Sequence, residues 1–300
     1  MRAVRIAVPV TSVWRGLDSA GEADAAITRA QPDAGAWAAA LDTAARHTLL
    51  GRLDTQALLG EPALVVAEQD GWAQVRLPWQ PSNSALDGYP GWVPAAHLID
   101  EPRGMPAPAG SPASPAIPAL PADGAVVTAR LAAAVADDGE RLELSFGTVL
   151  PVAEPGRPLL RHPDGRVLTV DAADIAFADA RRDLDLIDRA RLFAGQPYLW
   201  AGLAGHGVDC SGFVHLVHRA AGRVIPRDAH DQALVGTPVP PDEVRAGDVV
   251  FFENASGVHH TGFALDAARL LHSPRTGKLV GEGSITNDYP GELHAFRRFL

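Results

Sequence analysis

The first hundred residues alternate apolar and polar positions in short runs divided by turn residues, a pattern that predicts β-strands. The clearest run is 72–77, which follows the turn pair Asp70-Gly71 and places large or long side chains at every second position. An apolar run at 63–68 precedes it, and a polar loop at 81–88 separates it from a third strand-like segment at 89–94. Short strands joined by tight turns predict a small β-barrel.

A helical pattern interrupts this alternation at residues 32–50. Asp33 and Asp42 are suitable N-cap residues, and apolar positions at helical spacing follow them. We therefore predict that residues 1–101 form an SH3-like barrel that carries the helical segment as an insertion.

The composition changes after residue 101. Prolines stand at positions 102, 106, 108, 112, 115, 118 and 121. This spacing predicts a semi-extended linker over 102–122, because proline fits neither a helix interior nor a central strand. Alternating runs then return, with turn signals at 137–139 and 163–165. They predict a second small SH3-like barrel over 123–179.

Residues 180–300 combine both periodicities and predict an α+β domain. A helix is expected at about 183–195, with its inward positions at Leu184, Ile187, Ala190 and Leu192. Strands are expected at 248–252, 259–265 and 270–272. The chain is therefore predicted to be multidomain, with two small all-β barrels followed by an α+β domain.

Composition narrows the functional classes. A formal net charge of −10 argues against nucleic acid or an anionic membrane as a partner. A single cysteine excludes an intramolecular disulfide framework and a multi-cysteine zinc site. The first residues lack the apolar core and cleavage site of a signal peptide, and no apolar run has the length of a membrane span. We therefore expect a cytoplasmic protein, or an extracytoplasmic one if the N-terminus is truncated.

That single cysteine, Cys210, stands at the start of a predicted helix. An apolar stripe at helical spacing follows it, and Gly222 supplies a stop signal. Asp209 occupies the N-cap position, so the thiol lies in the first turn, where the helix N-terminus favours the thiolate. The alternative is that Cys210 is a small buried apolar residue.

A cysteine nucleophile needs a base and a group that orients the base. On the strand 259–265, His260 shares its face with the small residues Gly262 and Ala264, which would let another element approach closely. A hairpin centred on residue 266 would place His272 directly opposite His260. Two alternatives stay open: a purely structural histidine pair, and a metal site of Cys210 with three histidines, although the spacing matches no zinc motif.

Several blocks of this region, in order over residues 190–275, resemble the NlpC/P60 cysteine peptidases. The blocks are Pro197-Tyr198-Leu199-Trp200-Ala201-Gly202, Asp209-Cys210-Ser211-Gly212-Phe213-Val214, Pro226-Arg227-Asp228, Gly247-Asp248-Val249-Val250-Phe251-Phe252, His260-Thr261-Gly262-Phe263 and Leu271-His272. The resemblance implies a papain-like core, no cofactor or metal, and hydrolysis of cell-wall peptides. By position, Cys210 would be the nucleophile, His260 the general base, His272 the orienting residue, and Tyr198 a neighbour of the oxyanion. Ala201 departs from the pattern, since the family usually has glycine there.

The N-terminal half resembles a narrower branch, in which bacterial SH3 domains precede the peptidase domain of γ-D-glutamyl-L-diamino acid endopeptidases that recycle murein peptides. The resemblance rests on the segments 55–61 and 88–92. It implies a murein peptide substrate with a free N-terminal L-Ala, whose ammonium would be held by Glu61, Tyr89 and Asp228. Trp200, Asp209 and Ser211 would line the site for the D-Glu portion, and the product would be L-Ala-γ-D-Glu.

Each of the substrate-binding assignments has a structural alternative. Glu61 would then be a surface turn residue, and Tyr89 would pack in the barrel. Trp200 would belong to the core beneath the helix, and Asp209 would only cap the helix. Two other functions also remain open: a non-catalytic binder of wall peptides, and an acyltransferase or amidase on the same papain-like core.

Overall fold

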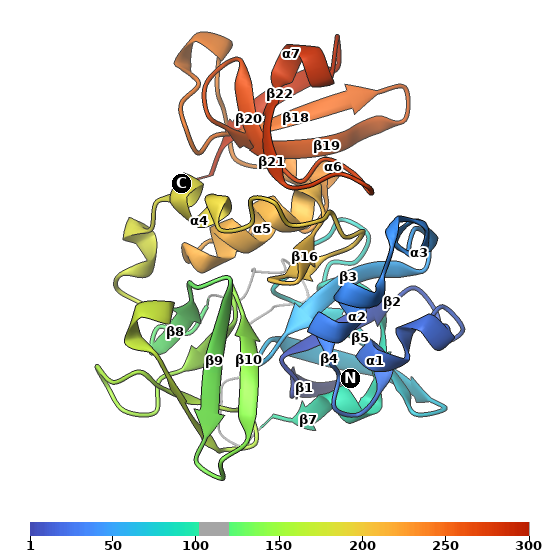
Figure 1. Cartoon of the computed structure of the whole chain (residues 1–300), viewed down its shortest axis with the longest axis vertical. Helices are drawn as coiled ribbons and strands as arrows, with labels where there is room; N and C mark the ends of the chain where they lie inside the picture. The colour runs from blue at the N-terminus through green and yellow to red at the C-terminus, as the bar shows by residue number, and fades with distance from the viewer. Residues whose placement is uncertain (102–119, 300) are drawn as a thin grey trace.

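The computed structural model describes residues 1–101 and 120–299, and Figure 1 shows three β-rich units in chain order. The N-terminal unit and the middle unit lie side by side, and the sheet of the C-terminal unit lies at the far end of the molecule (Figure 1). Most of the predicted linker, residues 102–119, lies outside the described residues. Within the described residues, no helix is both long enough and apolar enough to cross a membrane.

The N-terminal unit is built on a seven-stranded antiparallel sheet in the order β3-β2-β6-β5-β4-β1-β7. Its strands are β1 (Arg2–Ile6), β2 (Val10–Trp14), β3 (Leu53–Leu58), β4 (Pro62–Gln69), β5 (Trp72–Leu77), β6 (Tyr89–Pro94) and β7 (Leu98–Asp100). The predicted alternation holds in β5, where Ala73, Val75 and Leu77 are fully buried and the residues between them are partly exposed.

The helical insertion is divided into short helices. They are a 3-10 turn at Glu22–Asp24, α1 (Ala25–Thr28), α2 (Ala34–Ala40) and α3 (Thr43–Thr48). The predicted caps are confirmed: the Asp33 carboxylate accepts the backbone N–H of Ala36, and Asp42 accepts that of Ala45, each at 2.8 Å. Leu41 lies between the two caps in an extended conformation, which divides the expected helical stretch in two.

The middle unit contains a four-stranded sheet in the order β10-β9-β13-β12 and a three-stranded sheet in the order β11-β8-β14. Its strands are β8 (Gly124–Val127), β9 (Leu131–Ala136), β10 (Arg141–Ser145), β11 (Val149–Pro151), β12 (Leu159–Arg161), β13 (Val167–Val170) and β14 (Ile175–Phe177). Strand β9 has the sequence Leu-Ala-Ala-Ala-Val-Ala, and its low intrinsic β-propensity hid it from sequence inspection.

The C-terminal unit packs helices against both faces of a six-stranded sheet in the order β17-β22-β18-β19-β20-β21. Its helices are α4 (Leu186–Arg191), α5 (Cys210–Ala220), α6 (Ala229–Gln232) and α7 (Ile285–Asp288), with a 3-10 turn at Arg181–Asp183. Its strands are β15 (Leu203–Ala204), β16 (Gly207–Val208), β17 (Thr237–Pro238), β18 (Val249–Asn254), β19 (Gly257–Ala264), β20 (Arg269–His272), β21 (Gly281–Ser284) and β22 (Leu293–Arg298). The predicted helix 183–195 is shorter than expected, and Leu192, expected inward, is exposed after its end.

Strand β3 of the N-terminal unit lies against the C-terminal unit. The indole of Trp200 donates to the carbonyl of Leu53 at 2.9 Å, and the side chain of Gln56 accepts the backbone N–H of Leu203 at 3.0 Å. The Arg227 guanidinium donates to the hydroxyl of Thr55 at 2.8 Å. These bonds hold the N-terminal unit beside the start of α5, where Cys210 stands.

Candidate active site

Cys210 is the first residue of α5, as the sequence predicts. The Asp209 carboxylate caps the helix by accepting the backbone N–H of Gly212 at 2.6 Å, and Gly222, with φ of +80°, follows its end. The rest of the helix is buried all round, whereas Cys210 itself is partly exposed. The thiol is therefore held at the one accessible end of a helix that the core fixes on every side.

His260 and His272 are brought together on β19 and β20. The Nε2 atom of His260 lies 2.8 Å from Nδ1 of His272, and both side chains are buried. The thiol of Cys210 interacts with the backbone N–H of Thr261, the residue after His260, because α5 packs across β19. His260 thus has one nitrogen bound to His272, which leaves Nδ1 as its remaining basic atom.

The predicted register of this hairpin is wrong, although the predicted contact is present. Phe263 pairs with Leu271 and Ala264 with Leu270, which centres the hairpin on residue 267. The loop has this centre because the Asp266 carboxylate accepts the backbone N–H groups of both Ala268 and Arg269. His272 is thereby opposite Gly262, where an added Cβ would lie 2.7 Å from the His272 Cβ. The two imidazoles meet diagonally across the space that glycine leaves.

Burial determines which protonation states of Cys210 and His260 are favoured in the enzyme without substrate. It raises the pKa of the Cys210 thiol to about 12, with the neighbouring Asp209 charge acting in the same direction. Burial lowers the pKa of His260 well below its usual range, and the charge of His272 adds to this. Both shifts favour a neutral thiol beside a neutral imidazole. The direction of the thiol pKa shift is opposite to the favoured thiolate expected at a helix N-terminus, because desolvation disfavours the charged form of the thiol.

Two tyrosines adjoin Cys210. The pKa of the predicted neighbour Tyr198 is raised by its burial and by the charge of Cys210. Tyr289 was not anticipated, since it lies beyond the recognised sequence blocks. Its pKa is raised by the same two causes, and its ring stacks on His260 with centroids 4.6 Å apart.

Arg227 organises the residues expected to line the D-Glu site. It donates to the Asp209 carboxylate at 2.7 Å and to the Ser211 hydroxyl at 3.0 Å, and all three side chains are buried. Ionised Asp209 raises the pKa of Arg227 further, against the lowering effect of burial. Arg227 belongs to the Pro226-Arg227-Asp228 block, but the sequence did not indicate a role for it. Trp200 is partly exposed, and its indole is bound to the N-terminal unit.

Tyr89 and Asp228 come together across the interface of the two units, as expected. The Tyr89 hydroxyl donates to the Asp228 carboxylate at 3.1 Å. Burial raises the pKa of Asp228, while Arg227 opposes the shift. Burial also raises the pKa of Tyr89, with contributions from Asp228 and from Asp54. Asp54 lies on β3 and is paired with Arg15 at 2.6 Å, and its charge acts on Tyr89 in the same direction as that of Asp228.

The structure contradicts the expectation for Glu61. This carboxylate is fully buried and forms an ion pair of 2.8 Å with Arg219, which is also fully buried. Its other oxygen accepts from the Gln80 side chain at 2.8 Å. Glu61 therefore has no surface to offer a ligand. It joins the N-terminal unit to the far turns of α5.

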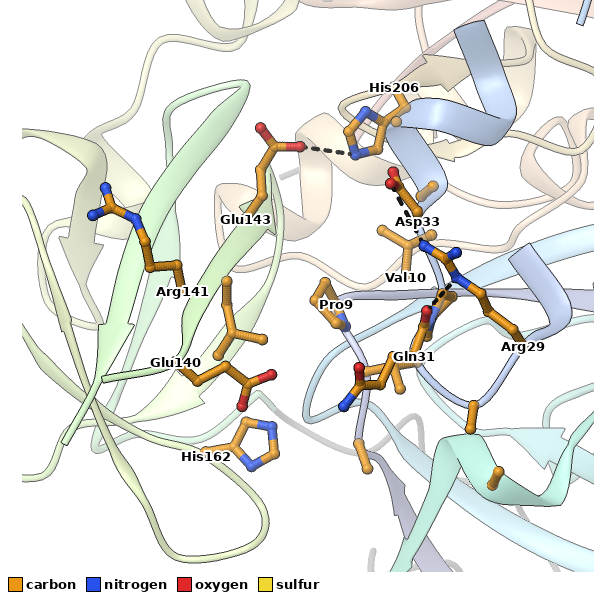
Figure 2. Close-up of a pocket in the computed structure, with 18 of the residues that line it drawn as sticks. Pro9, Val10, Arg29, Gln31, Asp33, Glu140, Arg141, Glu143, His162 and His206 are labelled. Carbon is orange, nitrogen blue, oxygen red and sulfur yellow. Dashed lines mark hydrogen bonds and ion pairs between the residues drawn. The ribbon is translucent and has the colours of Figure 1, made fainter. Parts of the chain in front are cut away.

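A cleft of about 890 Å³ lies between the N-terminal and middle units, away from this site. Figure 2 shows Pro9, Arg29 and Asp33 on one wall, Glu140, Arg141 and Glu143 on the other, and His206 facing Glu143. None of the predicted site residues lines it. Its lining has three arginines and three carboxylates and no Phe, Tyr or Trp ring, so it selects no ligand class.

A metal site at Cys210 finds no support in the geometry. Among the described residues, Asp228, His230 and Asp231 form the one group with three potential ligand atoms within 4.8 Å of one another. Both oxygens of Asp231 already accept hydrogen bonds from Asn83.

Comparison with known proteins agrees with this architecture. Residues 195–297 match the NlpC/P60 family, and residues 50–98 match the bacterial dipeptidyl-peptidase Sh3 domain. The chain is 36% identical over 255 residues to the gamma-D-glutamyl-L-lysine dipeptidyl-peptidase of Bacillus subtilis, covering 82% of this chain and 81% of the relative. It is 30% identical over 311 residues to the protein of the same name from Bacillus cereus, covering 98% and 90%.

A crystal structure of an NlpC/P60 family protein from Bacillus cereus has the same fold. It matches with a TM-score of 0.86 and 27% identity, covering 99% of both chains. The chain therefore belongs to the NlpC/P60 family of peptidases, with a bacterial SH3 domain preceding the NlpC/P60 domain.

Proposed function

We propose that this peptidase hydrolyses the γ-D-Glu–L-diamino acid bond of murein peptides that begin with a free L-Ala, and releases L-Ala-γ-D-Glu. The observation that carries the proposal is the convergence of two groups on one helix end. The Cys210 thiol interacts with the backbone N–H of Thr261, the residue after His260 of the His260–His272 pair, and the Tyr89–Asp228 pair lies across the interface with the N-terminal unit. The gamma-D-glutamyl-L-lysine dipeptidyl-peptidases among the relatives support the substrate class.

The neutral thiol and imidazole define the first chemical step. As the sulfur attacks the γ-carbonyl carbon of D-Glu, His260 accepts the thiol proton, and His272 holds the imidazole through its Nε2 atom. The π electron pair of the carbonyl group moves to its oxygen. The resulting oxyanion accepts hydrogen bonds from the Tyr198 hydroxyl and from the backbone N–H of Cys210, which has no intrahelical partner at the start of the helix. Burial of this site strengthens both interactions.

The leaving amine then takes the proton from His260, and a thioester between Cys210 and the γ-carbonyl remains. Water attacks the thioester carbonyl while His260 accepts its proton. Collapse of the second tetrahedral intermediate breaks the C–S bond, the sulfur regains the proton from His260, and the γ-carboxylate of D-Glu is released.

The substrate ammonium would lie between the two units. An ammonium has three donors and, when dehydrated, needs anionic acceptors. Asp228, the Tyr89 oxygen and Asp54 supply three acceptors in place of the set first expected. A bound cation would also favour the ionised form of Asp228, whose pKa burial raises.

The D-Glu portion of the substrate would face Asp209, Ser211 and Trp200. Arg227 is buried behind them, and its bonds to Asp209 and Ser211 fix the orientation of these two side chains. We also propose that the three boundaries expected from the sequence, after residues 101, 122 and 179, are domain boundaries, and that the middle unit is a second SH3-like barrel.

The proposal is tested with L-Ala-γ-D-Glu-L-Lys, its diaminopimelate analogue and their N-acetyl forms, with products identified by mass spectrometry. Cys210→Ala should abolish hydrolysis while the melting temperature is kept. Asp54→Asn and Asp228→Asn should each raise KM for the free-amine peptide at least about tenfold, the order of one charge-assisted hydrogen bond. Asp87→Asn, an exposed residue of the neighbouring loop, is the matched control.

Three outcomes would overturn the proposal. Full activity of Cys210→Ala would remove the nucleophile. Equal hydrolysis of free and N-acetylated peptides by the wild type would remove the ammonium site. Transfer of the acyl group to another amine, in place of hydrolysis, would make the protein an acyltransferase. Digests of intact sacculi beside the free tripeptide would show which form of murein is cut.

A further inference from the structure

Tyr289 lies at the active site although it is far from the recognised motifs in the chain. It directly follows α7, in the connection between β21 and β22. This short helix is anchored by the buried Ile285 and capped by Ser284, whose hydroxyl accepts the backbone N–H of Asn287 at 3.2 Å. The Asp288 carboxylate accepts a hydrogen bond from the backbone N–H of Ser284 at 2.7 Å. Tyr289 is thus presented by a locally fixed turn.

The ring of Tyr289 covers the His260 imidazole. The two rings are nearly parallel, with an interplanar angle of 15° and centroids 4.6 Å apart. Tyr289 also packs on Phe252 with centroids 4.3 Å apart, and Phe252 is the β18 residue paired with His260. One tyrosine ring therefore spans a cross-strand pair that includes the general base.

This stack restrains a motion that the hydrogen bond to His272 leaves free. The bond between Nε2 of His260 and Nδ1 of His272 fixes the distance of one ring atom. It does not fix the rotation of the imidazole plane about that atom, which sets the direction of Nδ1. A parallel aromatic neighbour restricts this rotation, because tilting the imidazole loses the stacked contact.

We propose that Tyr289 is a positioning residue of the peptidase, whose ring holds the His260 imidazole in the plane that directs Nδ1 to the Cys210 thiol. The inference rests on the proposed roles of Cys210 and His260. It concerns the aromatic face of Tyr289, so phenylalanine should replace it and an aliphatic side chain should not.

Two ionisable groups act directly on the pKa of His260: His272 on β20, and His259 on its own strand, which pairs with Glu292. Tyr289 after α7 stacks on the imidazole, and Asp288 beside it acts on His272. Cys210 on α5 acts on Tyr289. Removing the Tyr289 ring admits water to His260, whose pKa burial holds down, so that pKa should rise toward its ordinary value.

The test compares Tyr289→Phe with Tyr289→Leu in the full chain. For hydrolysis of L-Ala-γ-D-Glu-L-Lys, Tyr289→Leu should lower kcat about tenfold, which corresponds to about 1.4 kcal/mol, with little change in KM. The acidic limb of its kcat/KM profile should move to higher pH by about half a unit or more. Tyr289→Phe should stay near the wild type in both readouts. Phe177→Leu, which removes a partly buried ring from the middle unit, is the control for general loss of stability.

Alkylation of Cys210 by iodoacetamide across the same pH range gives a readout that needs no substrate. Its profile should shift in Tyr289→Leu and stay unchanged in Tyr289→Phe. Unshifted profiles in Tyr289→Leu, or equal losses in both variants, would overturn the role of the ring. If Tyr289→Leu does not fold, Tyr289→Met carries the same expectation. An inactive wild type with a Tyr289-dependent alkylation profile would refute the substrate assignment alone.

Discussion

The imidazoles of His260 and His272 form a hydrogen bond of 2.8 Å although the two residues are not opposite each other in the β-ladder. The contact is diagonal, and it depends on Gly262, which leaves room beside the His272 Cβ. Burial lowers the pKa of His272 to about 4, so it acts as a neutral partner of His260.

Replacing His272 should impair the reaction without removing the nucleophile. We expect His272→Ala to lower kcat about 10²-fold, because the His260 imidazole loses the bond that holds its Nε2 atom and general base catalysis depends on its orientation. Steady-state kinetics on the tripeptide measure this. His259→Ala is the matched control, because His259 is exposed and pairs with Glu292 at the surface. Equal effects of the two substitutions would contradict the assignment.

Glu61 should act on stability and not on substrate choice. Glu61→Gln leaves the fully buried Arg219 guanidinium without its counter-charge, which typically costs about 3–5 kcal/mol. Denaturant unfolding measures the loss. Glu154→Gln, at the exposed pair with Arg157, should cost at most about 1 kcal/mol. A folded Glu61→Gln enzyme that lost its preference for free-amine peptides would show that Glu61 binds substrate after all.

Ala201 holds a backbone conformation that favours glycine. Its φ is +59°, in the left-handed region, where a Cβ costs roughly 1–2 kcal/mol. Glycine removes that strain but adds entropy to the unfolded chain, so we expect Ala201→Gly to stabilise the protein by about 0.5–1 kcal/mol. Thermal unfolding checks this, with Ala190→Gly inside α4 as a control that should destabilise. A lower melting temperature in both variants would argue against strain at Ala201.

Two buried histidines on α5 should make the fold sensitive to acid. Burial lowers the pKa of His215 to about 3 and that of His218 to about 4. Between these values and the ordinary histidine pKa near 6.5, the unfolded chain binds protons that the folded protein does not, so stability falls as pH decreases through this window. His218 alone would contribute on the order of 3 kcal/mol across it.

Unfolding free energies measured between pH 7 and pH 4 test this, and His218→Gln should flatten the dependence. His47→Gln, at an exposed position, should leave it unchanged. A wild-type stability that is constant over this range would contradict neutral burial of the two histidines.

Local patterns determined much of this molecule from sequence alone. The caps at Asp33, Asp42 and Asp209 were predictable because each bonds to a backbone group three residues away. The alternation of β5 follows from the two-residue period of a strand. The same period singled out His260 for a reason that is wrong, because α5 packs on the face of Phe263, whose ring lies 5.5 Å from that of Phe213, whereas Ala264 lies on the other face with Ile285. The ordered motifs around Cys210 indicated the family, which the comparisons then showed.

Tertiary structure decided what depends on contacts between distant segments. The Glu61–Arg219 pair joins residues 158 positions apart, so no local pattern showed that this carboxylate is buried. Asp54 reaches the site because the N-terminal unit docks on the C-terminal unit, and Tyr289 reaches it because the segment between β21 and β22 folds over His260. Spacing along the chain encodes neither contact. The direction of the Cys210 pKa shift also required the fold, since the helix N-terminus is a local feature but hydration is set by everything packed around the thiol.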